Sequence, residues 1–183
     1  IWNAALIKKI FLPREMFPVA SAYVAVVHFV PQLVVLLAGS LYYGWRPTVL
    51  GLAAVLAGFL IVTFAALGLG LIFGCLNVFF RDSENLVDLI LMIATWVSPV
   101  LYSAEMVKGA VPEWIWHVYQ ANPVTVAVEL FHYGFWSTAT GQSVPEIGSF
   151  LVLTLIGLVG SLIVLGLGQL AFKRTEGKFA QEL

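Results

Sequence analysis

Long stretches without a charged residue dominate the hydrophobic pattern of this chain. They run over residues 16–45, 47–80, 89–104 and 147–172. A helix needs about 20 apolar residues to cross the roughly 30 Å of hydrocarbon in a bilayer. Three stretches are long enough, and 89–104 becomes long enough if its helix starts near Leu86. The pattern predicts an all-α membrane protein with four transmembrane helices.

One more apolar region, residues 114–136, has a different pattern. Its only formal charge is Glu129, and Asn122-Pro123 interrupts it. Asparagine is a good N-cap and proline suits the first position of a helix. We therefore expect two short helices, 113–121 and 123–135. The second would rise only about 20 Å, so the region is predicted to be an external re-entrant helical hairpin before the last span.

The positive charges support this arrangement. With four crossings, only Arg46 and Lys108 lie on one side, and the other side holds Lys8, Lys9, Arg14, Arg81, Lys173, Arg174 and Lys178. Positive residues are enriched in cytoplasmic loops. A fifth crossing at 114–136 would spoil this asymmetry. Both ends of the chain are therefore predicted to lie in the cytoplasm.

The predicted layout is a single multi-pass domain in the cytoplasmic membrane. No secretory signal is visible and the first residue is Ile1, so we expect an N-terminal part of a longer protein to be missing. The predicted segments are a cytoplasmic lead-in 1–15, spans 16–43, 49–76, 87–103 and 147–172, the external re-entrant segment 104–146 and a cytoplasmic tail 173–183.

Composition excludes several classes of protein. Hydrophobic residues make up 61% of the chain and charged residues 10%, whereas soluble domains have about 45–50% and 25%. This excludes an ordinary soluble enzyme and a disordered chain. The net charge of −1 offers no basic field for a nucleic acid. A single cysteine, Cys75, excludes a disulfide framework and a multi-cysteine metal site.

Few residues suggest chemistry. Glu129 and His132 lie on one helical face and could form a metal or proton site, but no third ligand or HExxH pattern accompanies them. The alternative is a hydrated carboxylate near the outer interface. No P-loop, nucleophile elbow or paired-carboxylate site is present, so we expect no catalytic residue, no metal and no cofactor bound by this chain.

Aromatic residues and glycines suggest contacts instead. The aromatics of the external region fit an interfacial belt, or a lining for sugar rings in which Trp96, Tyr102 and Tyr133 are the best candidates. Small residues let helices approach closely in membranes. We assign this packing role to Gly68 and to the step Gly70–Gly74 and, in the last span, to Gly157, Ser161, Gly166 and Gly168.

Several motifs resemble the permeases of polysaccharide ABC exporters. The lead-in 6–15 (LIKKIFLPRE) resembles the segment before the third span of these permeases. Similar motifs follow in the same order at 68–70 (GLG), 76–82 (LNVFFRD), 98–102 (SPVLY) and 122–123 (NP). The chain is similar in particular to actinobacterial galactan exporters. Such permeases export O-antigen, teichoic acid or galactan chains on a polyprenyl diphosphate lipid.

The resemblance implies partners and sites. It implies six spans, of which this chain holds the third to sixth, a homodimer, and two partner ATPase subunits that bind ATP and Mg²⁺. It also implies an aromatic-lined channel. The ATPase-docking residues would be Phe11, Pro13, Arg14, Glu15, Phe80, Arg81 and Asp82. Two rival hypotheses are a membrane-embedded enzyme acting on lipid-linked sugars through Glu129 with Glu105 or Glu113, and a passive channel or scaffold subunit.

Overall fold

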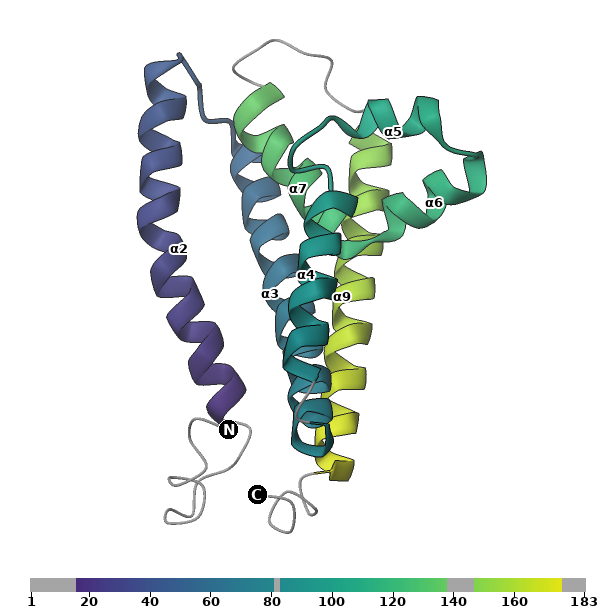
Figure 1. Ribbon diagram of the computed structural model, residues 1–183. Coiled ribbons are helices and arrows are strands. Elements are labelled where there is room, and N and C mark those ends of the chain that lie inside the picture. The colour runs from purple at the N-terminus through teal and green to yellow at the C-terminus, as the bar shows by residue number, and fades with distance from the viewer. Residues whose placement is uncertain (1–15, 81–82, 138–146, 176–183) are drawn as a thin grey trace.

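The computed structural model describes residues 16–80, 83–137 and 147–175, and no strand occurs among them (Figure 1). The all-α fold class is therefore confirmed. The elements are α2 (Met16–Tyr42), α3 (Val49–Phe79), α4 (Ser83–Val97), α5 (Ala104–Ala110), α6 (Glu113–Ala121), α7 (Pro123–Phe131), the π-helix η1 (His132–Ser137) and α9 (Ile147–Thr175).

Three helices of the described chain are long and apolar enough to cross a membrane. They are Val19–Tyr42 in α2, Val49–Phe79 in α3 and Phe150–Thr175 in α9. The predicted span 87–103 differs from the structure, because α4 has 15 residues and ends at Val97, a rise of only about 22 Å. A proline disfavours helix at the residue before it, and Ser98 precedes Pro99 in a buried turn. A fourth crossing stays a prediction.

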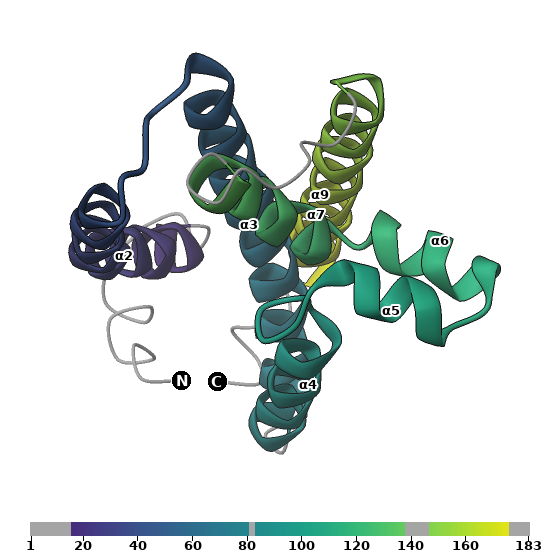
Figure 2. The ribbon, with the colours of Figure 1, turned by 90° about the horizontal axis from the view of Figure 1, so that it is seen from above.

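The core lies where α3 packs along α9 (Figures 1 and 2). The buried positions of α3 are three or four residues apart, so they form one stripe along the helix. Most of them are small, which lets neighbouring backbones come close in a membrane. They are Gly51, Ala54, Gly58, Ile61, Ala65, Gly68, Leu71 and Cys75.

The closest backbone approach joins Gly68 of α3 to Gly168 of α9. A Cβ atom on Gly68 would lie 2.6 Å from the backbone nitrogen of Leu165, and one on Gly168 would collide with the carbonyl of Gly68. The predicted packing of Gly68, Gly157, Ser161 and Gly168 is confirmed, since Ser161 is also buried and a Cβ on Gly157 would meet Val126.

The predicted packing role is wrong for Gly70, Gly74 and Gly166 within the described chain. A Cβ atom on any of them would meet nothing within 4 Å. Two residues along a helix correspond to about 200° of rotation. Gly70 therefore faces away from α9 because Gly68 faces toward it.

Helix α7 packs into the angle between α3 and α9. Val126, Ala127 and Leu130 join Ala54 and Ile61 in one buried cluster. The start of α7 lies part-way along α9, because Pro123 approaches Gly160, which follows the first residue of α9 by 13 positions, or about 20 Å. The chain then returns toward the end where α3 begins, and Gly134 of η1 contacts Gly51. Thus α7 and η1 line the half of α3 that follows Thr48.

Helices α2 and α4 are peripheral to this core (Figure 2). No residue in the apolar window of α2 is buried. Its main link is Phe29, which stacks on Phe59 of α3 at 5.5 Å between ring centroids and meets Phe131 of α7 edge-on at 6.3 Å. The first turn of α2, the last turns of α3 and α9 and the start of α4 lie at one end of the molecule (Figure 1). This agrees with the arrangement that the charges predict.

Candidate functional site

The connection between α3 and α4 presents one of the predicted docking residues. Phe80 follows α3 and is 66% exposed. The hydroxyl of Ser83 donates to the carbonyl of Phe80 and, at 3.3 Å, to Oδ1 of Asn77. These bonds tie the end of α3 to the start of α4, and they leave the Phe80 ring on the surface. The other predicted docking residues lie outside the described residues: Phe11, Pro13, Arg14, Glu15, Arg81 and Asp82.

The elbow between α6 and α7 forms as its sequence predicts. The side chain of Asn122 accepts a hydrogen bond from the backbone nitrogen of Val124 at 3.1 Å, and Pro123 occupies the first turn of α7. The cap satisfies one of the amide groups that a helix start leaves without a partner. It fixes α6 against α7 at a sharp angle, part-way along α9.

Glu129, near the end of α7, and His132, the first residue of η1, do share a face. Nδ1 of His132 lies 3.5 Å from Oε1 of Glu129, and both side chains are a little less than half exposed. Such a partly hydrated pair contributes little to stability. No group of three His, Cys, Asp or Glu side chains suited to a metal ion occurs in the described part of the chain. The arrangement fits the hydrated-carboxylate interpretation of Glu129.

Two tyrosines meet beside Glu129. The hydroxyl of Tyr102 donates to the carbonyl oxygens of Trp96 and Val97 at 3.0 and 2.9 Å, so it satisfies the end of α4. Tyr119 of α6 is buried, and its hydroxyl lies near the Tyr102 side chain but makes no hydrogen bond of good geometry among the described residues. Burial raises the pKa of the Tyr119 phenol above its ordinary value of 10, and nearby Tyr102 and Glu129 add to the rise.

The three predicted channel residues occupy different environments. Trp96 is 66% exposed on α4, and Tyr102, which follows the end of that helix, is half-buried. Tyr133, by contrast, is 9% exposed in the core and packs on Phe150 with 4.7 Å between ring centroids. An open aromatic surface therefore exists at Trp96, whereas Tyr133 has the position of a packing residue.

Sequence reasoning missed the contact that fixes the turn between α2 and α3. Nε1 of Trp45, between α2 and α3, donates to the carbonyl of Gly134 at 2.8 Å, and its ring lies 5.1 Å from that of Phe135. Trp45 is 5% exposed. The signal available was a tryptophan in a turn that lies between two spans. Its partner, 89 residues away, has no local sequence signal.

A comparison with known protein families identifies the family to which this helical chain belongs. The sequence profile of the ABC-2 type transporter family matches residues 9–136, from the lead-in as far as η1. The chain belongs to the ABC-2 type transporter family. The apolar helices α2, α3 and α9 agree with a multi-pass membrane protein.

Two curated relatives carry a more specific name. Both are O-antigen export system permease proteins RfbA of Klebsiella pneumoniae, one 33% identical over 165 residues and the other 30% identical over 163. Each match covers 86% of this chain and 60% of the relative. The chain thus spans three fifths of the length of these ABC-2 permeases. No solved structure matches.

Proposed function

We propose that this chain is the membrane-spanning permease subunit of an ATP-driven exporter, and that its cargo is a polysaccharide on a polyprenyl diphosphate lipid. It would act as a pair of permease subunits with two ATPase subunits, which bind ATP and Mg²⁺. The observation that carries the proposal is the match to two O-antigen export permeases over 86% of the chain.

The position of α7 supports an external re-entrant hairpin. The elbow at Pro123 lies beside Gly160, about 20 Å along α9, and α7 then returns toward the start of α3. A helix pair that enters part-way and returns on the same side is tolerated at membrane depth where it is buried in protein. Ala127 and Leu130 meet that condition, being 0% and 3% exposed.

We propose that the cytoplasmic end of the helices receives the ATPase. Phe80 offers an exposed ring at the end of α3, and Arg81 and Asp82 follow it in the sequence. Closure of the ATPase pair on ATP would push on this loop and on the lead-in around Arg14. The helices would then shift as rigid bodies and open a path for the glycan, with Trp96 and Tyr102 beside it.

The test uses the full-length permease expressed with its ATPase and purified as a complex. We expect Arg14→Ala and Arg81→Ala to weaken assembly or to lower permease-dependent ATP hydrolysis. Arg46→Ala is the matched control, because Arg46 is an exposed arginine of the turn between α2 and α3, at the opposite end of α3 from Phe80. Equal effects of all three substitutions would refute the docking assignment. No association and no nucleotide dependence would refute the exporter itself.

A further inference from the structure

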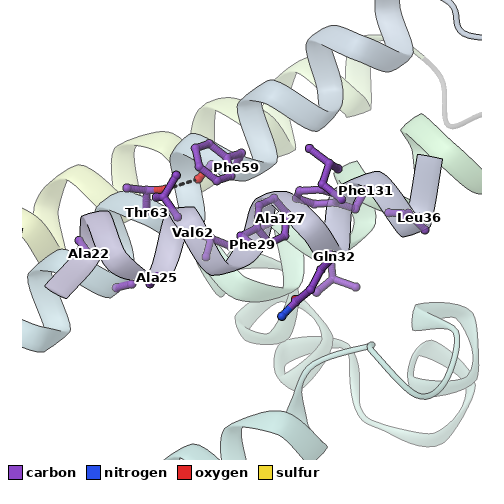
Figure 3. Close-up of a pocket in the computed structure, with 14 residues that line it drawn as sticks. Ala22, Ala25, Phe29, Gln32, Leu36, Phe59, Val62, Thr63, Ala127 and Phe131 are labelled. Carbon is purple, nitrogen blue, oxygen red and sulfur yellow. Dashed lines mark hydrogen bonds between the residues drawn. The ribbon is translucent and has the colours of Figure 1, made fainter. Parts of the chain in front are cut away.

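A cavity lies between α2, α3 and α7 that no proposed step of export uses. Its volume is about 510 Å³, within the range of known ligand pockets. Figure 3 shows its walls, which include Ala25 and Phe29 of α2, Phe59 and Val62 of α3, and Phe131 of α7. Ala66 of α3 also lines the cavity.

Nearly every side chain that lines this cavity is aliphatic or aromatic. The two polar side chains are Thr63 and Gln32. The hydroxyl of Thr63 already donates to the carbonyl of Phe59 at 2.8 Å, and the Gln32 amide nitrogen is turned away from Phe59 and Phe131 (Figure 3). An occupant with polar groups would lose its hydrogen bonds to water without gaining others. The walls therefore select a hydrocarbon.

The cavity is elongated. Its lining runs from Ala22 to Leu36 of α2, which is about 21 Å at 1.5 Å per residue. A slot of this length suits an extended methylene chain, whose carbon atoms would pack against the apolar walls at about 3.5–4.0 Å.

The cavity also lies at membrane depth. Its two long walls are the candidate spans Val19–Tyr42 and Val49–Phe79. Residues of α2 next to the lining face outward, with Val30 and Val34 more than half exposed. At that depth the acyl chains of the bilayer are the hydrocarbon available to fill such a cavity.

We propose that the cavity between α2, α3 and α7 is a binding site for one acyl chain of a membrane phospholipid, which holds α2 against the core. The phospholipid would act as a structural ligand, because its acyl chain would supply packing contacts that the side chains of α2 do not make with the core. This site is independent of the proposed export function. It would exist in the permease whatever its cargo is.

The test is photo-crosslinking of the full-length permease in nanodiscs that contain phosphatidylethanolamine with a diazirine in one acyl chain. We expect label on the peptides that carry Phe29 and Phe131. Ala66→Trp fills the cavity and should remove this label, and Ala66→Leu should reduce it. Ala53→Trp is the matched control, since Ala53 is an exposed alanine of α3 outside the lining, and it should leave the label unchanged.

Two further measurements keep the outcome decisive. Each variant must elute from a size-exclusion column as the wild type does and keep the midpoint of thermal unfolding. If Ala66→Trp does not fold, Ala66→Leu replaces it. A parallel nanodisc carries a diazirine polyprenyl phosphate at the same mole fraction. The proposal is overturned if the label is equal in the Ala66 and Ala53 variants, if only the polyprenyl probe labels Phe29 and Phe131, or if neither probe does.

Discussion

The contact between Gly68 and α9 leads to a prediction whose size follows from the structure. In Gly68→Ala the new methyl would lie 2.6 Å from the backbone nitrogen of Leu165 and from the carbonyl group of Val164, whereas ordinary contact begins at 3.4 Å. Helix α9 must therefore move by about 0.8 Å along a well-packed surface. Overpacking costs about 1–3 kcal/mol, and backbone atoms cannot rotate aside, so we expect about 2–3 kcal/mol.

Gly70→Ala provides the matched control on the same helix. It adds the same methyl group where nothing lies within 4 Å, and alanine is favoured over glycine in a helix by about 0.5–1 kcal/mol. That propensity gain is common to both variants, so their difference isolates the packing cost. A difference of about 2–3 kcal/mol corresponds to roughly 30- to 150-fold in the folding equilibrium.

The assay is reversible unfolding in mixed micelles with added SDS, followed by tryptophan fluorescence, for which the chain has six tryptophans. Gly168→Ala should reproduce the loss, because its methyl would collide with the Gly68 carbonyl from the other side. If Gly68→Ala and Gly70→Ala unfold within about 0.5 kcal/mol of each other, the close approach of α3 to α9 is refuted, since additive errors are of that size.

Four other predictions concern polar side chains of the described residues. Trp45→Phe should cost about 1–3 kcal/mol in the same assay, because it leaves the buried Gly134 carbonyl without its donor. Tyr102→Phe should cost about 0.5–1.5 kcal/mol by the same measurement, since it removes the bond to the end of α4. Thr125→Val should raise the SDS midpoint of unfolding, because the buried Thr125 hydroxyl has no hydrogen-bond partner in the described chain. Tyr119 should stay protonated above pH 10 in a titration at 295 nm that compares the wild type with Tyr119→Phe, since its pKa is raised on folding.

Each of these four predictions has a control variant or an opposite result that would contradict it. Trp114→Phe and Tyr23→Phe alter rings that are 69% and 70% exposed, and they should leave stability unchanged. Thr95→Val should not stabilise, because that hydroxyl already donates to Leu91. The raised pKa of Tyr119 contributes stability that is complete below pH 10 and is lost as the pH rises further. A full tyrosine titration near pH 10 would contradict the burial of this phenol.

Helix bounds were predictable where local chemistry decides them. Helix α6 occupies Glu113–Ala121 as predicted, and Asn122-Pro123 starts α7, because capping depends on adjacent residues. The third predicted span was wrong in its bounds because hydropathy continues past Val97 while Pro99 ends the helix. The π-helix η1 and the short helix α5 had no pattern of their own at this length.

Contacts between distant residues were less predictable. Hydropathy treats Gly68 and Gly70 alike, and only the rotation of α3 against α9 assigns the close approach to Gly68. The choice of Tyr133 as a channel residue had the same weakness, because an aromatic side chain near an interface packs inward or outward according to its neighbours. Glu129 and His132 are three positions apart in the sequence, and their pairing was predictable for that reason.

The division between the core and the peripheral helices has a mechanical consequence. Helices α3, α7 and α9 meet through backbone contacts at Gly58, Gly68 and Gly168, so the unit they form is stiff and transmits a displacement over its full length with little loss. Helix α2 touches that unit mainly through the ring of Phe29, so its elastic resistance to tilting is small. A load applied at the Phe80 end would therefore translate the stiff unit, and the strain would concentrate at α2.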